Sequence, residues 1–150
     1  MEIQKIDIDN SGNSIQPIDD GLLARTAGSW TEEKLDYLIR YLDIFTTSMK
    51  GKPWRSINYI DLFSGPGKCK IRDTNRIVLG SPLLALCLQN PFDNYFFVDN
   101  NPENIIVLQQ RCSQTKLFSK TNFQVGDCNQ VVNKITNTIQ QLDLVFIKDK

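Results

Sequence analysis

The sequence has no histidine, so the most common general base and a frequent metal ligand are excluded from any mechanism. Its four cysteines, at positions 69, 87, 112 and 128, form no C-x-x-C pair, so no zinc site is indicated. Reduced thiols of a cytoplasmic protein are the simplest interpretation. No stretch of 18 apolar residues occurs, and residues 1–29 lack the basic and then apolar order of a secretion signal. We therefore expect a cytoplasmic chain with no membrane span and no metal site.

Net charge is also absent. Seventeen Lys and Arg residues balance seventeen Asp and Glu residues, so the chain as a whole has no attraction to a polyanion. Nucleic acid remains a candidate partner only through a local basic patch. Of the 150 residues, 41% are apolar and 23% are charged, which is near the globular average. The length fits one folded domain.

The N-terminal 28 residues are polar and have no sustained periodicity, which predicts a mobile arm or an irregular lead-in before a domain at 29–150. The pattern S-x-x-E at 29–32 has the form of a capping box, and the apolar residues after it recur at helical spacing. We therefore predict an amphipathic helix at 31–48. Its apolar face would cover a sheet, and Trp30, Lys34 and Tyr41 could border a ligand cleft.

Four short apolar runs predict strands at 57–62, 95–98, 122–125 and 142–147. Helices are expected between them: one capped by Ser81 with Pro82 in its first turn, one opened by Pro102, and one after Asp127. This alternation predicts parallel β-α-β units and a doubly wound α/β sheet with its ligand crevice at the carboxyl ends of the strands.

A polar stretch with four cations, residues 68–76, lies between the first strand and the helix at Ser81. We expect a long loop there. Its cations could meet an anionic substrate or simply stay solvated, and we favour the solvated interpretation.

The stretch N-Y-I-D-L-F-S-G-P-G at 58–67 predicts a buried strand that ends in a tight glycine turn. Acids stand at three successive strand ends: Asp61, Asp99 and Asp127. An adenosine-containing ligand could use the glycine turn beside its charged tail, Asp99 for ribose hydroxyls, and Asp127 with the Cys128 backbone for adenine. Aspartates that only cap turns and helices are the alternative.

A nicotinamide dinucleotide fits this pattern less well. Gly65 and Asp99 are 34 positions apart, and no third glycine completes the G-x-G-x-x-G motif of that ligand. A cationic sulfonium ligand suits D-L-F-S-G-P-G better, because an acid would lie near its ammonium group.

These residues resemble known families. D-L-F-S-G-P-G at 61–67, Asp99 and G-D at 126–127 resemble the cofactor motifs of class I S-adenosylmethionine-dependent methyltransferases, and D-L-F-x-G is similar to DNA cytosine methyltransferases. A closer resemblance is to the three-Cys-motif partner proteins, which are bacterial proteins with a methyltransferase-like fold. It covers about residues 28–147 and rests on G-S-W-T-E-E-K-L (28–35), Y-I-D-L-F-S-G-P-G (59–67), L-G-S-P-L-L-A-L (79–86) and G-D-C-N (126–129).

The resemblance implies a Rossmann-like sheet of about four strands, the N-terminal part of a class I methyltransferase-like fold, with S-adenosylmethionine as cofactor. Asp61 and Gly65 would border its methionine part, Asp99 the ribose and Asp127 the adenine. The complete set of expected cofactor-binding residues is Asp61, Phe63, Gly65, Gly67, Asp99, Asn100, Asp127 and Cys128. No catalytic residue is assigned, and the implied partner is a protein with a three-cysteine motif.

The chain departs from that family after the fourth predicted strand, where F-I-K-D-K stands in place of an acid-proline segment and further strands. We therefore expect a C-terminally truncated chain whose last strand is an open edge exposing Leu144 and Phe146. Two functions stay open. One is an S-adenosylmethionine-binding methyltransferase with an unknown substrate, nucleic acid among the candidates. The other is a non-catalytic partner-binding module of a mobile-element or phage-defence system, or an inactive fragment.

Overall fold

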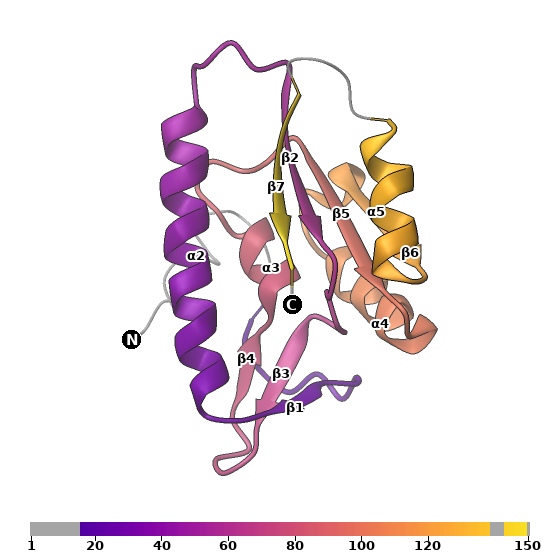
Figure 1. The fold of residues 1–150 in the computed structure, drawn as a ribbon. Helices are drawn as coiled ribbons and strands as arrows, with labels where there is room; N and C mark the ends of the chain where they lie inside the picture. The colour runs from indigo at the N-terminus through magenta and orange to yellow at the C-terminus, as the bar shows by residue number, and fades with distance from the viewer. Residues whose placement is uncertain (1–15, 139–142, 150) are drawn as a thin grey trace.

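A four-stranded, all-parallel sheet is the centre of the protein in the computed structural model, which describes residues 16–138 and 143–149 (Figure 1). The strand order is β6-β5-β2-β7. The strands are β2 (Ser56–Asp61), β5 (Asn94–Asp99), β6 (Thr121–Val125) and β7 (Asp143–Lys148). The chain runs outward from β2 through β5 to β6 and then returns to the other side of β2. The direction of winding therefore changes between β2 and β7.

Helices cover both faces of this sheet. The face that carries Tyr59 and Phe97 packs in one core with α2 (Trp30–Met49), α3 (Ser81–Leu86) and α4 (Pro102–Cys112). The opposite face, with Ile60 and Val98, packs against Val131 of α5 (Cys128–Thr136). Neighbouring residues of β2 thus face opposite layers, as the period of two in a strand requires. Figure 1 shows α2 and α5 on opposite sides of the sheet. The predicted alternation of strands and helices is confirmed.

Helix α2 confirms the predicted helix but not its predicted cap. Leu35, Ile39 and Leu42 are buried at the expected helical spacing. Ser29 itself has helical backbone angles, φ −60° and ψ −31°, and its side chain makes no capping hydrogen bond. Instead, the Thr31 N–H donates to the Gly28 carbonyl oxygen at 3.1 Å. The S-x-x-E pattern therefore marked the position of the helix start without forming a capping box.

The start of α3 also differs from the prediction. Gly80, in extended conformation, is the N-cap, and Ser81 is the first helical residue, with Pro82 in the first turn as expected. The Ser81 hydroxyl donates to the Asp61 carboxylate at 2.5 Å rather than to the helix backbone. A tertiary hydrogen bond has therefore replaced the predicted cap.

The prediction of a loop at 68–76 is wrong for the first half of that stretch. β3 (Lys68–Ile71) and β4 (Ile77–Leu79) form an antiparallel hairpin, and β1 (Arg25–Ala27) adds to β3 in parallel. Cys69 and Ile71 are buried. Residues 68–71 therefore alternate between cationic and apolar side chains, which is the pattern of a strand. Residues 25–27, within the predicted arm, thus form a strand. Residues 1–15 lie outside the described part of the chain.

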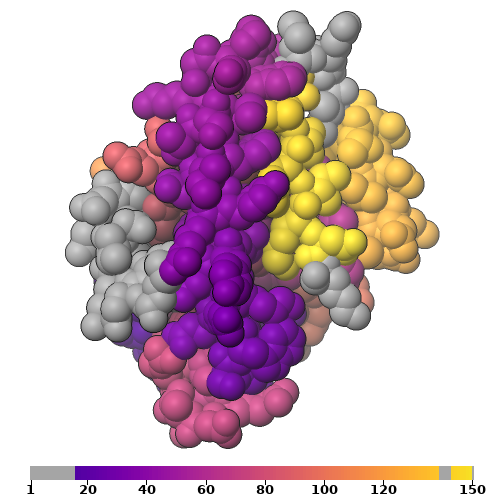
Figure 2. Space-filling view, turned by 60° about the vertical axis from the view of Figure 1, so that its left-hand side comes forward, coloured from indigo at the N-terminus to yellow at the C-terminus, as the bar shows by residue number. Residues whose placement is uncertain are grey.

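Strand β7 pairs with β2 and is an edge strand among the described strands. Leu144 and Phe146, which were expected to be exposed, are half-buried. The Phe146 ring lies 5.6 Å from Tyr41 and 5.9 Å from Tyr59, so α2 covers it. Figure 2 shows α2 and β7 side by side. Ile147 is the exposed apolar residue, at 46%. The helix predicted after Asp127 was expected to include Ile139, and the last predicted strand begins at Leu142; both residues lie outside the described part of the chain.

Candidate functional site

A tight glycine turn follows β2 and is fixed on both sides. Gly65 and Gly67 have φ of 65° and 99°, in the left-handed region that favours glycine. A Cβ on Gly67 would lie 2.9 Å from Leu108 Cδ1 and 3.3 Å from Leu83 Cδ1, because α4 and α3 press on the turn. The Gly65 N–H donates to Asp99 Oδ2 at 2.9 Å. The turn therefore joins the ends of β2 and β5.

Asp99 is half-buried at the end of β5 and has most of its acceptor positions occupied. Its Oδ2 accepts the Gly65 N–H, and its Oδ1 accepts the Asn101 N–H at 2.9 Å and Asn104 Nδ2 at 3.2 Å. A carboxylate has about four acceptor positions. Asp99 can therefore accept about one more hydrogen bond, at Oδ2. Asn100, beside it, is exposed.

Asp127 is exposed and caps α5 by accepting the Asn129 N–H at 2.9 Å. The preceding residue, Gly126, donates its N–H to the Asp99 carbonyl oxygen at 3.1 Å, which ties the loop after β6 to the end of β5. Cys128 is half-buried at the first position of α5. The structure thus brings the loops that carry Asp99 and Asp127 together through their backbones.

Asp61 is fully buried and is the centre of a polar cluster at the end of β2. It accepts hydrogen bonds from the Ser81 hydroxyl at 2.5 Å, the Phe63 N–H at 3.2 Å and the Tyr59 hydroxyl at 3.4 Å. Lys148, at the end of β7, places its ammonium group 3.5 Å from the same carboxylate. Burial, and then the charge of Asp61, raises the pKa of Tyr59 well above its usual value. Asp61 therefore already has a cationic partner where β2 and β7 meet.

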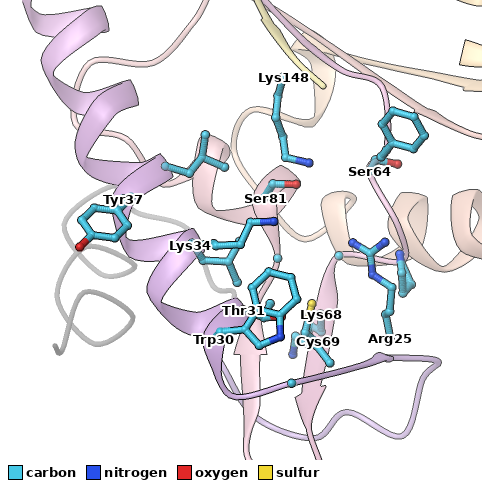
Figure 3. A pocket seen from close by; sticks show the side chains of 18 of the residues that line it. Arg25, Trp30, Thr31, Lys34, Tyr37, Ser64, Lys68, Cys69, Ser81 and Lys148 are labelled. Atoms are coloured by element: carbon cyan, nitrogen blue, oxygen red, sulfur yellow. The ribbon is translucent and has the colours of Figure 1, made fainter. Parts of the chain in front are cut away.

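A cavity of about 920 Å³ opens beside this turn (Figure 3). That volume is typical of ligand pockets, which span roughly 300–1,000 Å³. Its walls come from β1, the N-terminal half of α2, the turn after β2, the β3–β4 hairpin and the end of β7. Figure 3 shows Lys34 of α2 and Lys148 of β7 extending toward the same space. The cavity therefore lies at the carboxyl ends of β2 and β7, where the winding direction changes and ligands of open α/β sheets commonly bind.

The predicted site residues divide between this cavity and the neighbouring strand ends. Phe63 and Gly67 line the cavity, as do the three residues of α2 expected at a cleft border. The other predicted residues are not part of its lining: Asp61, Gly65, Asp99, Asn100, Asp127 and Cys128. Asp61 nevertheless contacts three lining residues, Phe63, Ser81 and Lys148.

Sequence reasoning missed Arg25 and Lys148 as lining residues. Lys148 had a usable signal, because it directly follows a predicted parallel strand, as Asp99 does. Arg25 had none, since its strand lies inside a segment predicted to be irregular.

Two buried cations, Arg111 and Lys68, connect residues 18–23 to the glycine turn. Arg111 donates from Nη1 to the carbonyl oxygens of Pro66 and Leu23, both at 2.7 Å, and forms a bidentate pair with Asp20 at 2.8 and 2.9 Å. Lys68 lies 3.3 Å from the same Asp20 carboxylate. The hydrogen bond from Arg111 is the main reason that the pKa of Asp20 is far below its usual range. Burial lowers the pKa of Lys68 in spite of Asp20.

Comparison of the sequence with protein-family models and with curated proteins finds no match. In residues 16–138 and 143–149, no helix is long and apolar enough to cross a bilayer. The same residues contain no group of three or more Cys, Asp or Glu side chains arranged to hold a metal ion. The features that indicate a function are therefore the geometry of the glycine turn, the strand ends and the cavity.

Proposed function

We propose that this chain is an S-adenosylmethionine-binding domain of the class I methyltransferase type, related to the three-Cys-motif partner proteins. The observation that supports this most strongly is the glycine turn at the end of β2, held by Asp99 of β5. It lies where the order β6-β5-β2-β7 reverses its winding direction, next to a cavity of ligand size. In a Rossmann-like sheet this is the position of the ligand crevice.

The residues at the strand ends fit such a cofactor. The one acceptor position left on Asp99 Oδ2 suits a ribose hydroxyl. Asp127 uses Oδ1 for its helix cap, so its second oxygen can accept from an adenine amino group beside Cys128. At Gly65 the left-handed turn presents backbone without a side chain, and the atoms nearest to a Cβ there belong to the Arg25 guanidinium, so a ligand could approach the backbone at this point. Gly67, by contrast, is packed against α3 and α4.

The cofactor would supply an electrophilic methyl group on a sulfonium. The contribution of the chain would be to position the methyl acceptor, since alignment of two reactants can lower a barrier by about 7–11 kcal/mol. Phe63 and Gly67 connect the turn to the cavity, which would therefore hold the acceptor. The apolar side chains Leu35 and Leu38 on its α2 wall would exclude water from part of it.

Calorimetric titration with S-adenosylmethionine tests the proposal. We expect micromolar-range affinity for the full chain, weakened at least about tenfold, or 1.4 kcal/mol, in Asp99→Ala. Because Asp99 also holds the Gly65 N–H, circular dichroism must show that the variant is folded. Glu103→Gln is the matched control, since Glu103 is exposed in the first turn of α4 beside the same strand end. No binding to a folded wild-type chain would refute the proposal.

Two further titrations separate the details. Asp127→Ala with unchanged affinity would remove the adenine role of Asp127. Competition by a nicotinamide dinucleotide would indicate the alternative ligand class.

A non-catalytic partner-binding module is the second candidate, and the edge position of β7 favours it. Among the described strands β7 pairs with β2 alone, and Ile147 is 46% exposed. Edge strands present backbone groups to which another chain can add a strand. Under this proposal the partner would be a protein with a three-cysteine motif. A chain that stays monodisperse and monomeric in light scattering at high concentration would count against it.

A further inference from the structure

The cavity beside the glycine turn has an excess of positive charge. Its lining contains five cationic side chains and one acid: Arg25, Lys34, Lys68, Arg72 and Lys148 against Asp149. Two acids outside the lining contact members of this set, Asp20 at Lys68 and Asp61 at Lys148. If each of these three acids neutralises one cation, two positive charges remain. Because the whole chain has no net charge, this excess is a local feature that attracts an anion.

The same cavity has an aromatic wall. Trp30, Tyr37 and Tyr41 line it from α2, at spacings that place them on one side of the helix, and each is 61% exposed. Lys34, on the same stripe, lies 4.6 Å from the centre of the Trp30 ring. Exposed aromatic rings beside cations are the usual surface on which nucleobases stack.

The cationic and aromatic groups come from different walls. Arg25 belongs to β1, and a Cβ on Gly65 would lie 3.5 Å from its guanidinium carbon, so Arg25 reaches the turn from below in Figure 3. Trp30 stands on α2 on the other side of the space, whereas the Tyr37 ring points away from Arg25. A ligand that fills the cavity would therefore meet a fork of donors at one end and flat rings at the other. Guanidinium groups bind phosphate oxygens in a bidentate manner.

We propose that this cavity binds a nucleoside monophosphate unit, with its phosphate near Arg25 and its base against the rings of α2. This inference rests on the proposed function in one respect only: the bound nucleotide would be the methyl acceptor. Binding itself needs only the cavity. The unit is either a free nucleotide or one residue of a single-stranded nucleic acid, and both present the same phosphate and base.

The fluorescence of Trp30 gives a direct test. The chain has two tryptophans, and Trp54 is not part of the cavity lining, so Trp54→Phe leaves Trp30 as the sole reporter. The four nucleoside 5′-monophosphates, the matching nucleosides, inorganic phosphate and a single-stranded tetranucleotide are titrated without S-adenosylmethionine. We expect at least one monophosphate to quench Trp30, with its nucleoside binding about tenfold more weakly. Equal affinity for nucleoside and monophosphate, or quenching by phosphate alone, would overturn the proposal.

Variants of the two walls sharpen this test. Arg25→Gln should weaken the monophosphate about tenfold and reduce the salt dependence of the tetranucleotide by about one unit of slope. Tyr41→Leu, in the same aromatic stripe of the lining, should weaken binding at least about fivefold without changing that slope. Lys52→Gln, an exposed cation beyond the far end of α2, is the matched control and should change neither. An equal effect of Lys52→Gln and Arg25→Gln would refute a specific phosphate position.

Two comparisons identify the source and the role of the ligand. A tetranucleotide that binds more tightly than the monophosphate supports nucleic acid, and equal binding supports a free nucleotide. Saturating S-adenosylmethionine should leave nucleotide binding intact, whereas competition would overturn the assignment of the cavity to an acceptor. Nucleotide binding without any S-adenosylmethionine binding would refute the proposed function and leave this site standing. The reverse result would refute this inference alone.

Discussion

The Asp20 carboxylate is the group through which residues 18–23 are attached to the glycine turn, and Asp20→Asn should show what it contributes. Arg111 and Lys68, whose side chains are only 3% and 4% exposed, both contact it. Asparagine keeps the shape of the side chain but removes its charge. It also places an N–H donor where two buried cations need an acceptor. The variant should therefore lower the free energy of unfolding.

The contacts that remain set the size of this loss. In the variant, Arg111 keeps the carbonyl oxygens of Pro66 and Leu23, and Lys68 keeps that of Ile18 at 2.9 Å. The cost should then lie between that of one hydrogen bond to a charged group, roughly 1.5–3 kcal/mol, and that of a broken buried ion pair, roughly 3–5 kcal/mol. We expect about 3 kcal/mol by urea unfolding with an unchanged m value.

Asp19→Asn is the matched control for this prediction. Asp19 is exposed and its carboxylate accepts the neighbouring Gly21 N–H at 2.9 Å, so its loss should be below about 1 kcal/mol. Because the pKa of Asp20 is lowered in the folded state, the advantage of the wild type over Asp20→Asn should be complete above about pH 4 and shrink as the pH falls further. Equal losses in the two variants, or a gap that is constant from pH 7 to pH 2, would refute the reasoning.

Two other predictions concern the turn and the thiols. Gly67→Ala should lower the free energy of unfolding by about 3 kcal/mol in urea, because a Cβ would lie 2.9 Å from Leu108 Cδ1. Gly51→Ala is the control: Gly51 has φ of 79° and no atom within 4 Å of a Cβ, so the loss should be about 1 kcal/mol. Equal losses would show that backbone strain alone matters. Cys128 is half-buried and the other three cysteines are buried, so a thiol reagent at pH 8 should modify one cysteine quickly, and a fast phase that persists in Cys128→Ser would contradict this.

The parallel sheet could be predicted because each of its strands is a short apolar run followed by a turn signal. The small sheet could not, because its strands depend on one another. Arg25 and Thr26 of β1 are exposed, so β1 has no apolar pattern of its own and is specified by pairing with β3. In β3 the buried Lys68 made the alternation look like a charged loop. Its burial depends on Asp20, 48 positions away.

The candidate site was predictable to the same extent. The acids at the strand ends follow from the register of parallel strands, which places the ends of β2 and β5 together. The cavity beside them depends on where β1 and the hairpin meet α2, which no local pattern specifies. Ser81 shows what a local pattern cannot predict. Its sequence position favours a helix cap, but its hydroxyl donates to the buried Asp61 carboxylate and not to the helix backbone.

The turn side of the cavity is fixed by hydrogen bonds and packing, whereas the side chains on the α2 side are exposed. This difference affects which ligands the cavity can select. On the turn side, Asp99 holds the Gly65 N–H and Arg111 holds the Pro66 carbonyl oxygen, while α3 and α4 press on Gly67. A ligand there meets a pre-organised backbone and loses little free energy in ordering it. On the α2 side, Trp30 and Tyr37 are 61% exposed and can change rotamer. Substitutions on α2 should therefore change which base binds, and substitutions at the turn should change whether anything binds.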